Sequence, residues 1–146
     1  MRNNYHNIDF DFVKKPVNFN KFTDKKLLQY CLGATLYMPG TKNIFQKIKD
    51  KKMHHISSMV MCFEDSIKEQ DLDSAENNVL EHLEKVQELI DNGSLSHDNI
   101  PLIFLRVRNT DQFRSFVQRL SAENANVLSG FVFPKFHSYN ANEYLN

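Results

Sequence analysis

Four short apolar runs, each followed by a segment of helical periodicity, constrain the fold of this chain most strongly. The runs cover residues 34–38, 58–63, 102–107 and 130–133. They are apolar without regular alternation, a pattern typical of strands buried on both faces of a parallel sheet. Strands that alternate with helices pair in parallel through right-handed crossovers. The sequence therefore predicts an α/β fold with four βα units in one parallel sheet.

The segment from Leu72 to Asp91 has the clearest helical pattern. Its apolar residues recur every three or four positions and build one stripe for burial: Leu72, Ala75, Val79, Leu83, Val86 and Ile90. Glu81 and Lys85 can pair on the opposite side, four residues apart, and His82 is expected on that polar side as well. Asn92-Gly93 supplies residues suited to end the helix.

Shorter helices are expected where a capping residue precedes an apolar face. Thr23, Thr41 and the run from Asn109 to Asp111 are the predicted starts. The helix after Asn109 is expected to bury Phe113, Phe116, Val117 and Leu120. We divide the chain into an N-terminal arm, residues 1–21, and a βα domain, residues 22–146. The tail after Ser138 has helical character and no evident partner.

Charge and cysteine content exclude several classes of function. Eighteen basic residues balance eighteen acidic ones, and this neutrality gives no reason to expect a nucleic-acid or membrane partner. No run approaches the roughly 20 apolar residues that a membrane span requires, and residues 1–12 lack the apolar core of a secretory signal. Cys31 and Cys62 stand in apolar surroundings without metal-ligand spacing, so we expect two free thiols in a cytoplasmic protein.

Charged residues gather where the predicted strands end. In a parallel βα fold, functional residues lie at the carboxyl ends of the strands. Those ends carry the following residues: Pro39 and Gly40, Glu64 and Asp65, Arg106 and Arg108, and Pro134 and Lys135. Two carboxylates, two guanidinium groups and one ammonium suit an anionic substrate held beside a general acid, a base or a metal. We therefore expect a small anionic metabolite as the ligand.

Each of these residues also has a structural interpretation. Arg106 interrupts an apolar run, and a desolvated guanidinium requires an anion, which is either a substrate group or the carboxylate of Glu64 or Asp65. Glu64 and Asp65 can instead cap the next helix or stay solvated. Lys135 can be a surface lysine, and Gly40 can serve a turn or let a ligand approach the backbone. Metal-protease, dinucleotide, P-loop, esterase and thiol-redox motifs do not occur in the sequence.

Four of these segments, in order across residues 34–136, resemble the citrate lyase β-subunit-like family of C–C bond lyases. The family's first strand ends in a Leu-Phe-Val-Pro-Gly pattern, similar to residues 36–40, and its second ends Asp-Leu-Glu-Asp-Ser/Ala-Val, similar to residues 61–67. Its third strand carries Val-Arg-Val-Asn, which matches Arg106, although Arg108 takes the asparagine position. Its fourth strand ends in Pro-Lys, as at Pro134-Lys135. The branch encoded near tellurium-resistance gene clusters looks most similar.

The resemblance implies a (β/α)₈ TIM barrel, of which this chain supplies the N-terminal half. It also implies Mg²⁺ and a substrate that is a CoA thioester or a 2-oxo or hydroxy acid. Arg106 would then be catalytic, together with Glu64 and Asp65. Pro39, Gly40, Arg108 and Lys135 would bind substrate. The family's metal carboxylates come from the fifth and sixth strands, so no metal ligand is expected in this segment.

Two functions remain open at this point. The chain can be part of a lyase, with Arg106 and the metal stabilising an enolate as a C–C bond breaks or forms. Alternatively, it can be a non-catalytic half-barrel that binds an anion or a partner and lacks the metal site. Because a TIM barrel usually needs about 250 residues, we expect a fragment, one half of a two-chain barrel, or an open sheet. We expect either a homo-oligomer or completion by a C-terminal half.

Overall fold

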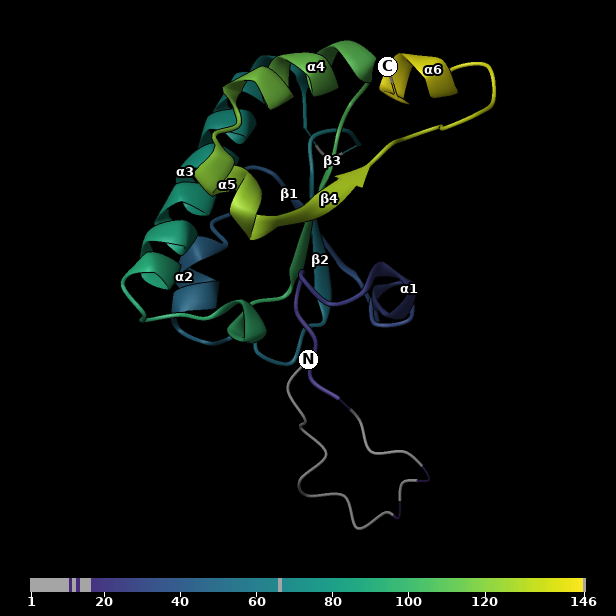
Figure 1. Cartoon of the computed structure of the whole chain (residues 1–146). Helices are drawn as coiled ribbons and strands as arrows, with labels where there is room; N and C mark the ends of the chain where they lie inside the picture. The colour runs from purple at the N-terminus through teal and green to yellow at the C-terminus, as the bar shows by residue number, and fades with distance from the viewer. Residues whose placement is uncertain (1–10, 12, 14–16, 66, 146) are drawn as a thin grey trace.

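The computed structural model describes residues 11, 13, 17–65 and 67–145. Most of the predicted arm, residues 1–21, lies outside the described residues. The helices and strands alternate along the chain (Figure 1): α1 Lys25–Leu28, β1 Leu36–Pro39, α2 Phe45–Lys49, β2 Ser58–Cys62, α3 Leu72–Asp91, β3 Leu102–Arg106, α4 Thr110–Arg119, α5 Ala122–Val127, β4 Leu128–Val132 and α6 Ala141–Leu145. Short 3₁₀ turns, Glu69–Asp71 and His97–Asn99, precede α3 and β3.

The described strands form one four-stranded parallel sheet in the order β1-β2-β3-β4. This confirms the predicted α/β fold with four parallel strands. Consecutive strands are neighbours, so each crossover returns to the adjacent position, as in a barrel rather than in a sheet wound from its centre. The register shifts once, between Ile103 and Phe104, where β4 pairs through Leu128 and then Gly130.

Helices α2 to α5 lie together on one face of the sheet, and α1 lies on the other (Figure 1). Contacts between α2 and α3 and between α3 and α5 join the covering helices into one layer. The long α3 runs through the middle of this layer. The opposite sheet face, which would line the interior of a closed barrel, is covered by α1 near one end.

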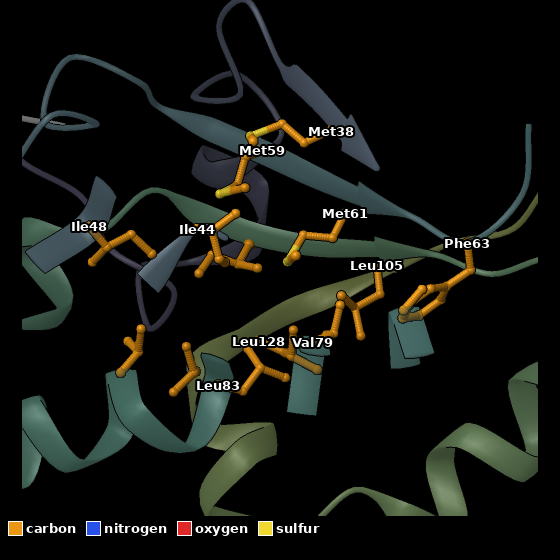
Figure 2. Close-up of a cluster of buried hydrophobic side chains, with 14 of the residues drawn as sticks. Met38, Ile44, Ile48, Met59, Met61, Phe63, Val79, Leu83, Leu105 and Leu128 are labelled. Carbon is orange, nitrogen blue, oxygen red and sulfur yellow. The ribbon is translucent and has the colours of Figure 1, made fainter. Parts of the chain in front are cut away.

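The core lies between the sheet and α3 (Figure 2). Every residue of β2 is buried, which accounts for its uninterrupted apolar sequence. Side chains that alternate along β2 and β3 point toward the helices and are fully buried, namely Met59, Met61, Ile103 and Leu105. They meet Val79 and Leu83 of α3.

Helix α3 has the bounds predicted from its periodicity. Ala75, Val79, Leu83 and Val86 are completely buried, and the predicted pair between Glu81 and Lys85 forms. The expectation for His82 was wrong, because this ring is only 4% exposed. The buried surface of α3 is therefore wider than the stripe of apolar residues indicates.

Helix starts differ from the predictions by one or two residues. Asp24, not Thr23, caps α1 by accepting a hydrogen bond from the Lys26 amide. Asn43, not Thr41, accepts the Gln46 amide at the start of α2. The predicted cap at Asn109 is confirmed, since its side chain accepts the Gln112 amide at 2.9 Å.

Two features near the C-terminus were not predicted. Helix α5 fills residues that carried no expected element, with Ser121 as its cap. Val117, expected in the core, is 39% exposed, because α4 presents Phe116 to the sheet instead. Among the described residues, no helix combines the length and the apolar character needed to cross a membrane.

The tail helix α6 does have a partner. Tyr144 is buried and stacks on Phe133, with ring centroids 4.4 Å apart. The ring of Phe133 also meets Phe113 of α4 edge to face. This aromatic cluster fixes α6 beside α4, at the end of the molecule where β3 gives way to α4 (Figure 1).

Gly40 follows β1 and packs against Phe63. A Cβ atom at this position would lie 2.9 Å from Cε1 of the Phe63 ring, and that ring is completely buried. The Gly40 amide donates to the Cys62 carbonyl at 2.9 Å, which holds the turn against β2. A glycine is therefore required here for packing.

We expect Gly40→Ala to destabilise the fold by about 1–3 kcal/mol, the usual cost of overpacking a core. Urea unfolding measures the change. Because the clash is with one ring, the same substitution in a Phe63→Leu background should cost clearly less than it does in the natural sequence. Equal costs in the two backgrounds would show that the Phe63 ring is not the obstacle.

We expect the stability of the chain to fall as the pH drops below about 6.5, the ordinary pKa of histidine. Burial lowers the pKa of His82; the charge of Glu81 opposes this to a smaller extent, and the charge of Lys85 lowers the pKa further. Protons therefore bind the unfolded chain preferentially, so the stability present above this pH is lost on acidification. Burial also lowers the pKa of His97.

Urea unfolding of the natural chain and of His82→Gln at about pH 7.5 and about pH 5.5 tests this. The variant should lose less stability on acidification than the natural chain does. An identical loss in both would mean that His82 does not carry the effect.

Candidate functional site

The parallel register brings the ends of the strands to one level. Pro39 at the end of β1 pairs with Cys62, Cys62 pairs with Arg106, and Arg106 pairs with Val132. Residues that follow these positions therefore emerge at a common edge of the sheet. This edge corresponds to the mouth of a barrel, where the sequence predicted the site.

Arg106 is the centre of the charged group at this edge. Its guanidinium forms ion pairs with Glu64 and with Asp65, both from the loop after the neighbouring strand β2. The Nη1 to Oδ2 distance to Asp65 is 2.8 Å. The Arg106 side chain is 23% exposed and that of Glu64 is 12% exposed, whereas that of Asp65 is 69% exposed. Arg106 thus has one protected carboxylate partner and one at the surface.

The two carboxylates control the electrostatics of Arg106. Burial lowers the pKa of its guanidinium, but the negative charges of Glu64 and Asp65 outweigh burial and raise this pKa above its ordinary value. The guanidinium is therefore permanently charged. Its charge is largely neutralised by Glu64 and Asp65, from the loop after the neighbouring strand β2.

Lys135, in the loop after β4, lies beside the Glu64 carboxylate of this charged group. Its Nζ lies 3.7 Å from Oε1 of Glu64, and its side chain is 81% exposed. The backbone of Lys135 has φ of 50°, a left-handed conformation that is unusual for residues other than glycine. Asn140 donates to the Lys135 carbonyl at 3.0 Å and helps to hold this turn. Glu64, Asp65, Arg106 and Lys135 therefore meet at one place.

A cavity of about 260 Å³ opens beside this group. It is lined by Tyr37, Met38, Pro39, Cys62, Asp65 and Arg106. Its walls are thus apolar on the β1 side and charged on the β3 side. Such a combination can hold a small molecule with a carboxylate at one end and a carbon skeleton at the other.

Of the predicted substrate-binding residues, Pro39 lines this cavity, whereas Gly40, Arg108 and Lys135 do not. Gly40 is buried against Phe63. Arg108 turns away from the charged group and donates to the backbone carbonyls of Phe63 and Ile67. Their contacts in the structure are therefore with the protein itself.

The described residues do not form a metal site. No group of three or more His, Cys, Asp or Glu side chains among them is arranged to hold a metal ion. Glu64 and Asp65, the carboxylates at the edge, are both turned to Arg106. This donor set does not fit Mg²⁺, so we derive no step through a metal on these strands.

The sequence interpretation missed three residues near this site. Tyr37 and Cys62 line the cavity, and strand alternation could have placed both on the same sheet face as Pro39 and Arg106. Tyr144 of α6 lies close enough to Glu64 to feel its charge. Burial raises the pKa of the Tyr144 hydroxyl, and the charges of Glu64 and Glu143 raise it further. No local pattern in the tail indicates this position.

Comparison with known proteins agrees with this arrangement. The family described as C–C bond lyases of the TIM-barrel fold matches residues 26–146. None of the curated proteins matches the chain. The match covers the four strands and every residue of the charged group. The chain therefore belongs to the C–C bond lyase family of the TIM-barrel fold.

Proposed function

We propose that this chain provides the carboxylate-binding part of a lyase or aldolase that breaks or forms a C–C bond in a 2-oxo acid, a hydroxy acid or a CoA thioester. The support is family membership together with one observation. A guanidinium at the mouth of the parallel sheet adjoins a cavity with apolar walls. The sequence motifs favour the citrate lyase β-subunit-like branch, and within it the one encoded near tellurium-resistance genes.

The unequal partners of Arg106 indicate where a substrate would bind. Asp65 is mostly exposed, and surface ion pairs contribute at most about 1 kcal/mol. Glu64 is nearly buried, so breaking its pair with Arg106 would leave a desolvated charge. A substrate carboxylate would therefore displace Asp65 from Nη1 and leave the pair with Glu64 in place. Asp65 also lines the cavity, so its movement would open the space for the ligand.

The residues of the charged group then have distinct roles. Arg106 binds the carboxylate and stabilises negative charge that develops on the substrate. Glu64 orients Arg106, and Lys135 adds an exposed positive charge beside Glu64. Tyr37 and Pro39 contact the carbon skeleton from the β1 side. In the proposed lyase, Mg²⁺ is held by residues outside these four strands, as the family resemblance implies.

We further propose that four more strands complete the barrel. A TIM barrel has eight strands, and the sheet described here has four, with β1 and β4 at its edges. The sheet face opposite α3 leaves Tyr37 51% exposed. The missing strands come from a second copy of this chain or from another segment of polypeptide. Free thiols at Cys31 and Cys62 favour a cytoplasmic location.

The alternative is a non-catalytic half-barrel that binds an anion or a partner. The specific observation in its favour is that Arg106 is already neutralised by two carboxylates. In a purely structural ion-pair cluster, removing Asp65 would not improve the binding of any ligand. The two functions of Arg106 can therefore be separated by experiment.

We expect Arg106→Lys to weaken binding of oxaloacetate, a small 2-oxo acid, by about tenfold or more, because lysine cannot form the paired hydrogen bonds of a guanidinium. Asp65→Asn should strengthen binding a few-fold, since it removes the competing charge. Isothermal titration calorimetry measures both affinities. Arg114→Lys is the matched control, because Arg114 is on the surface of α4 and its hydrogen bond is to the Glu143 carbonyl, away from the charged group.

Unfolding in urea should show that each variant remains folded. Weaker binding by Asp65→Asn would contradict displacement and make Asp65 a ligand-binding residue. An absence of oxaloacetate binding by the natural chain and by Asp65→Asn alike would reject the proposed carboxylate site.

We expect the chain to associate in solution, because uncovered strand edges and an exposed sheet face favour pairing with other strands. Light scattering at increasing concentration measures the mass. Tyr37→Glu should reduce association, whereas Tyr139→Glu, at a position 79% exposed and outside the sheet, should not. A monomer at all concentrations would contradict the expected association.

A further inference from the structure

Arg108 lies two residues beyond Arg106, where the family pattern has asparagine. Its guanidinium does not join the charged group. Nε donates to the Phe63 carbonyl at 3.3 Å, and Nη2 donates to the Ile67 carbonyl. These two carbonyls stand at the two ends of the loop that follows β2. One side chain therefore bridges the loop that carries Glu64 and Asp65.

Apart from the ion pairs of Glu64 and Asp65 with Arg106 and the buried side chains of Phe63 and Ile67, few described hydrogen bonds tie the bridged loop to the body. The Phe63 amide donates to the Arg106 carbonyl at 2.9 Å and extends the β2–β3 pairing by one residue. Within the loop, the Ile67 amide donates to the Glu64 carbonyl at 3.0 Å, and the Glu64 amide donates to Sγ of Cys62 at 3.3 Å. Between its two buried ends, the loop is also held by the hydrogen bonds that Arg108 donates to its backbone, so these bonds contribute to the position of the Glu64 carboxylate beside Arg106.

Arg108 is itself held by a buried polar chain that leads to α3. The Arg108 amide donates to Oε1 of Gln112 at 3.0 Å, and Nε2 of Gln112 donates to Glu76 at 2.6 Å. Gln112 is 6% exposed and Glu76 is 4% exposed. Arg119 neutralises the buried Glu76 carboxylate at 2.5 Å. Because the oxygen and the nitrogen of the Gln112 side-chain amide are both hydrogen-bonded, its orientation is fixed. This network of hydrogen bonds therefore links the position of α3 to Arg108.

We infer that Arg108 is a positioning residue: it clamps the loop at Phe63 and Ile67, and so sets the geometry of Glu64 and Arg106 for the ligand. This inference rests on the proposed carboxylate site. Asparagine at this position is too short to span two carbonyls at opposite ends of a loop. Arginine at this position can therefore form a backbone-bridging contact that asparagine cannot form.

The variant Arg108→Lys tests the brace, because lysine keeps the charge but cannot bridge two carbonyls with a planar group. Amide hydrogen exchange of the full chain gives the readout. The Ile67 amide donates to the Glu64 carbonyl within the loop, so its exchange should rise about tenfold or more when the loop loses the charged donor that holds the Ile67 carbonyl. Exchange at Ile103, in the central strand β3, should not change. Arg114→Lys is the control and should leave both amides unaffected.

Two further readouts separate positioning from simple support of the fold. The Arg106 side-chain Nε–H resonance should shift or broaden in Arg108→Lys and remain unchanged in Arg114→Lys. Oxaloacetate affinity should fall several-fold in Arg108→Lys, although the residue does not line the cavity. The inference would be overturned if the Arg106 resonance or the exchange rate of the Ile67 amide did not change, or if the exchange rates of Ile67 and Ile103 rose equally.

Failure of this inference can be told apart from failure of the proposed function. Absence of oxaloacetate binding in the natural chain would reject the proposed function, while the Arg106 resonance and the Ile67 exchange would still test the brace. Equal oxaloacetate affinities in the natural chain and Arg108→Lys would reject only the positioning role. Should Arg108→Lys fail to fold, Gln112→Met replaces it. This substitution removes the support of Arg108 and leaves Arg119 beside Glu76, so a smaller rise in Ile67 exchange is expected, and none would overturn the inference.

Discussion

The ion pair between Arg106 and Glu64 is the interaction on which the mouth of this sheet depends. A guanidinium at the end of a buried strand requires an anion nearby, since an unpaired charge there would cost several kcal/mol. Parallel pairing supplies it, because the loop after β2 emerges beside the end of β3. The same pairing leaves Asp65 in the exposed second position. One protected and one exposed carboxylate beside Arg106 thus follow from the order of the strands.

The layers of the fold support this arrangement from the helix side. The core between the sheet and α3 fixes the strands, and the polar chain from Glu76 through Gln112 extends this rigidity to Arg108. The loop that carries Glu64 and Asp65 is thus supported by hydrogen bonds of residues that do not line the cavity.

Much of the fold could be predicted from the sequence because its signals are periodic. The stripe on α3 gave the bounds of that helix, and the apolar runs indicated parallel strands. Tertiary packing decided what periodicity could not. His82 is buried because its position, three residues after Val79 and four before Val86, lies at the edge of the apolar stripe, and only its polar side chain led to the opposite expectation. Val117 is exposed although its spacing fits a core position. Helix α5 was missed because its six residues contain little apolar sequence.

The residues of the candidate site could be predicted only where the sequence shows that a strand ends. The positions of Glu64, Asp65, Arg106 and Lys135 follow from topology. The direction of the Arg108 side chain does not follow from topology, because it depends on hydrogen bonds to backbone carbonyls that no sequence pattern indicates. The expectation that the tail after Ser138 has no evident partner failed for a similar reason, because the contact of Tyr144 with Phe133 depends on how the tail folds back.

A crystal structure of the chain with bound oxaloacetate would test the central claim most directly. The account predicts a ligand carboxylate at Nη1 of Arg106, Asp65 turned toward solvent, and Glu64 still paired with the guanidinium. A ligand bound elsewhere, or a guanidinium that keeps both of its carboxylates, would contradict it.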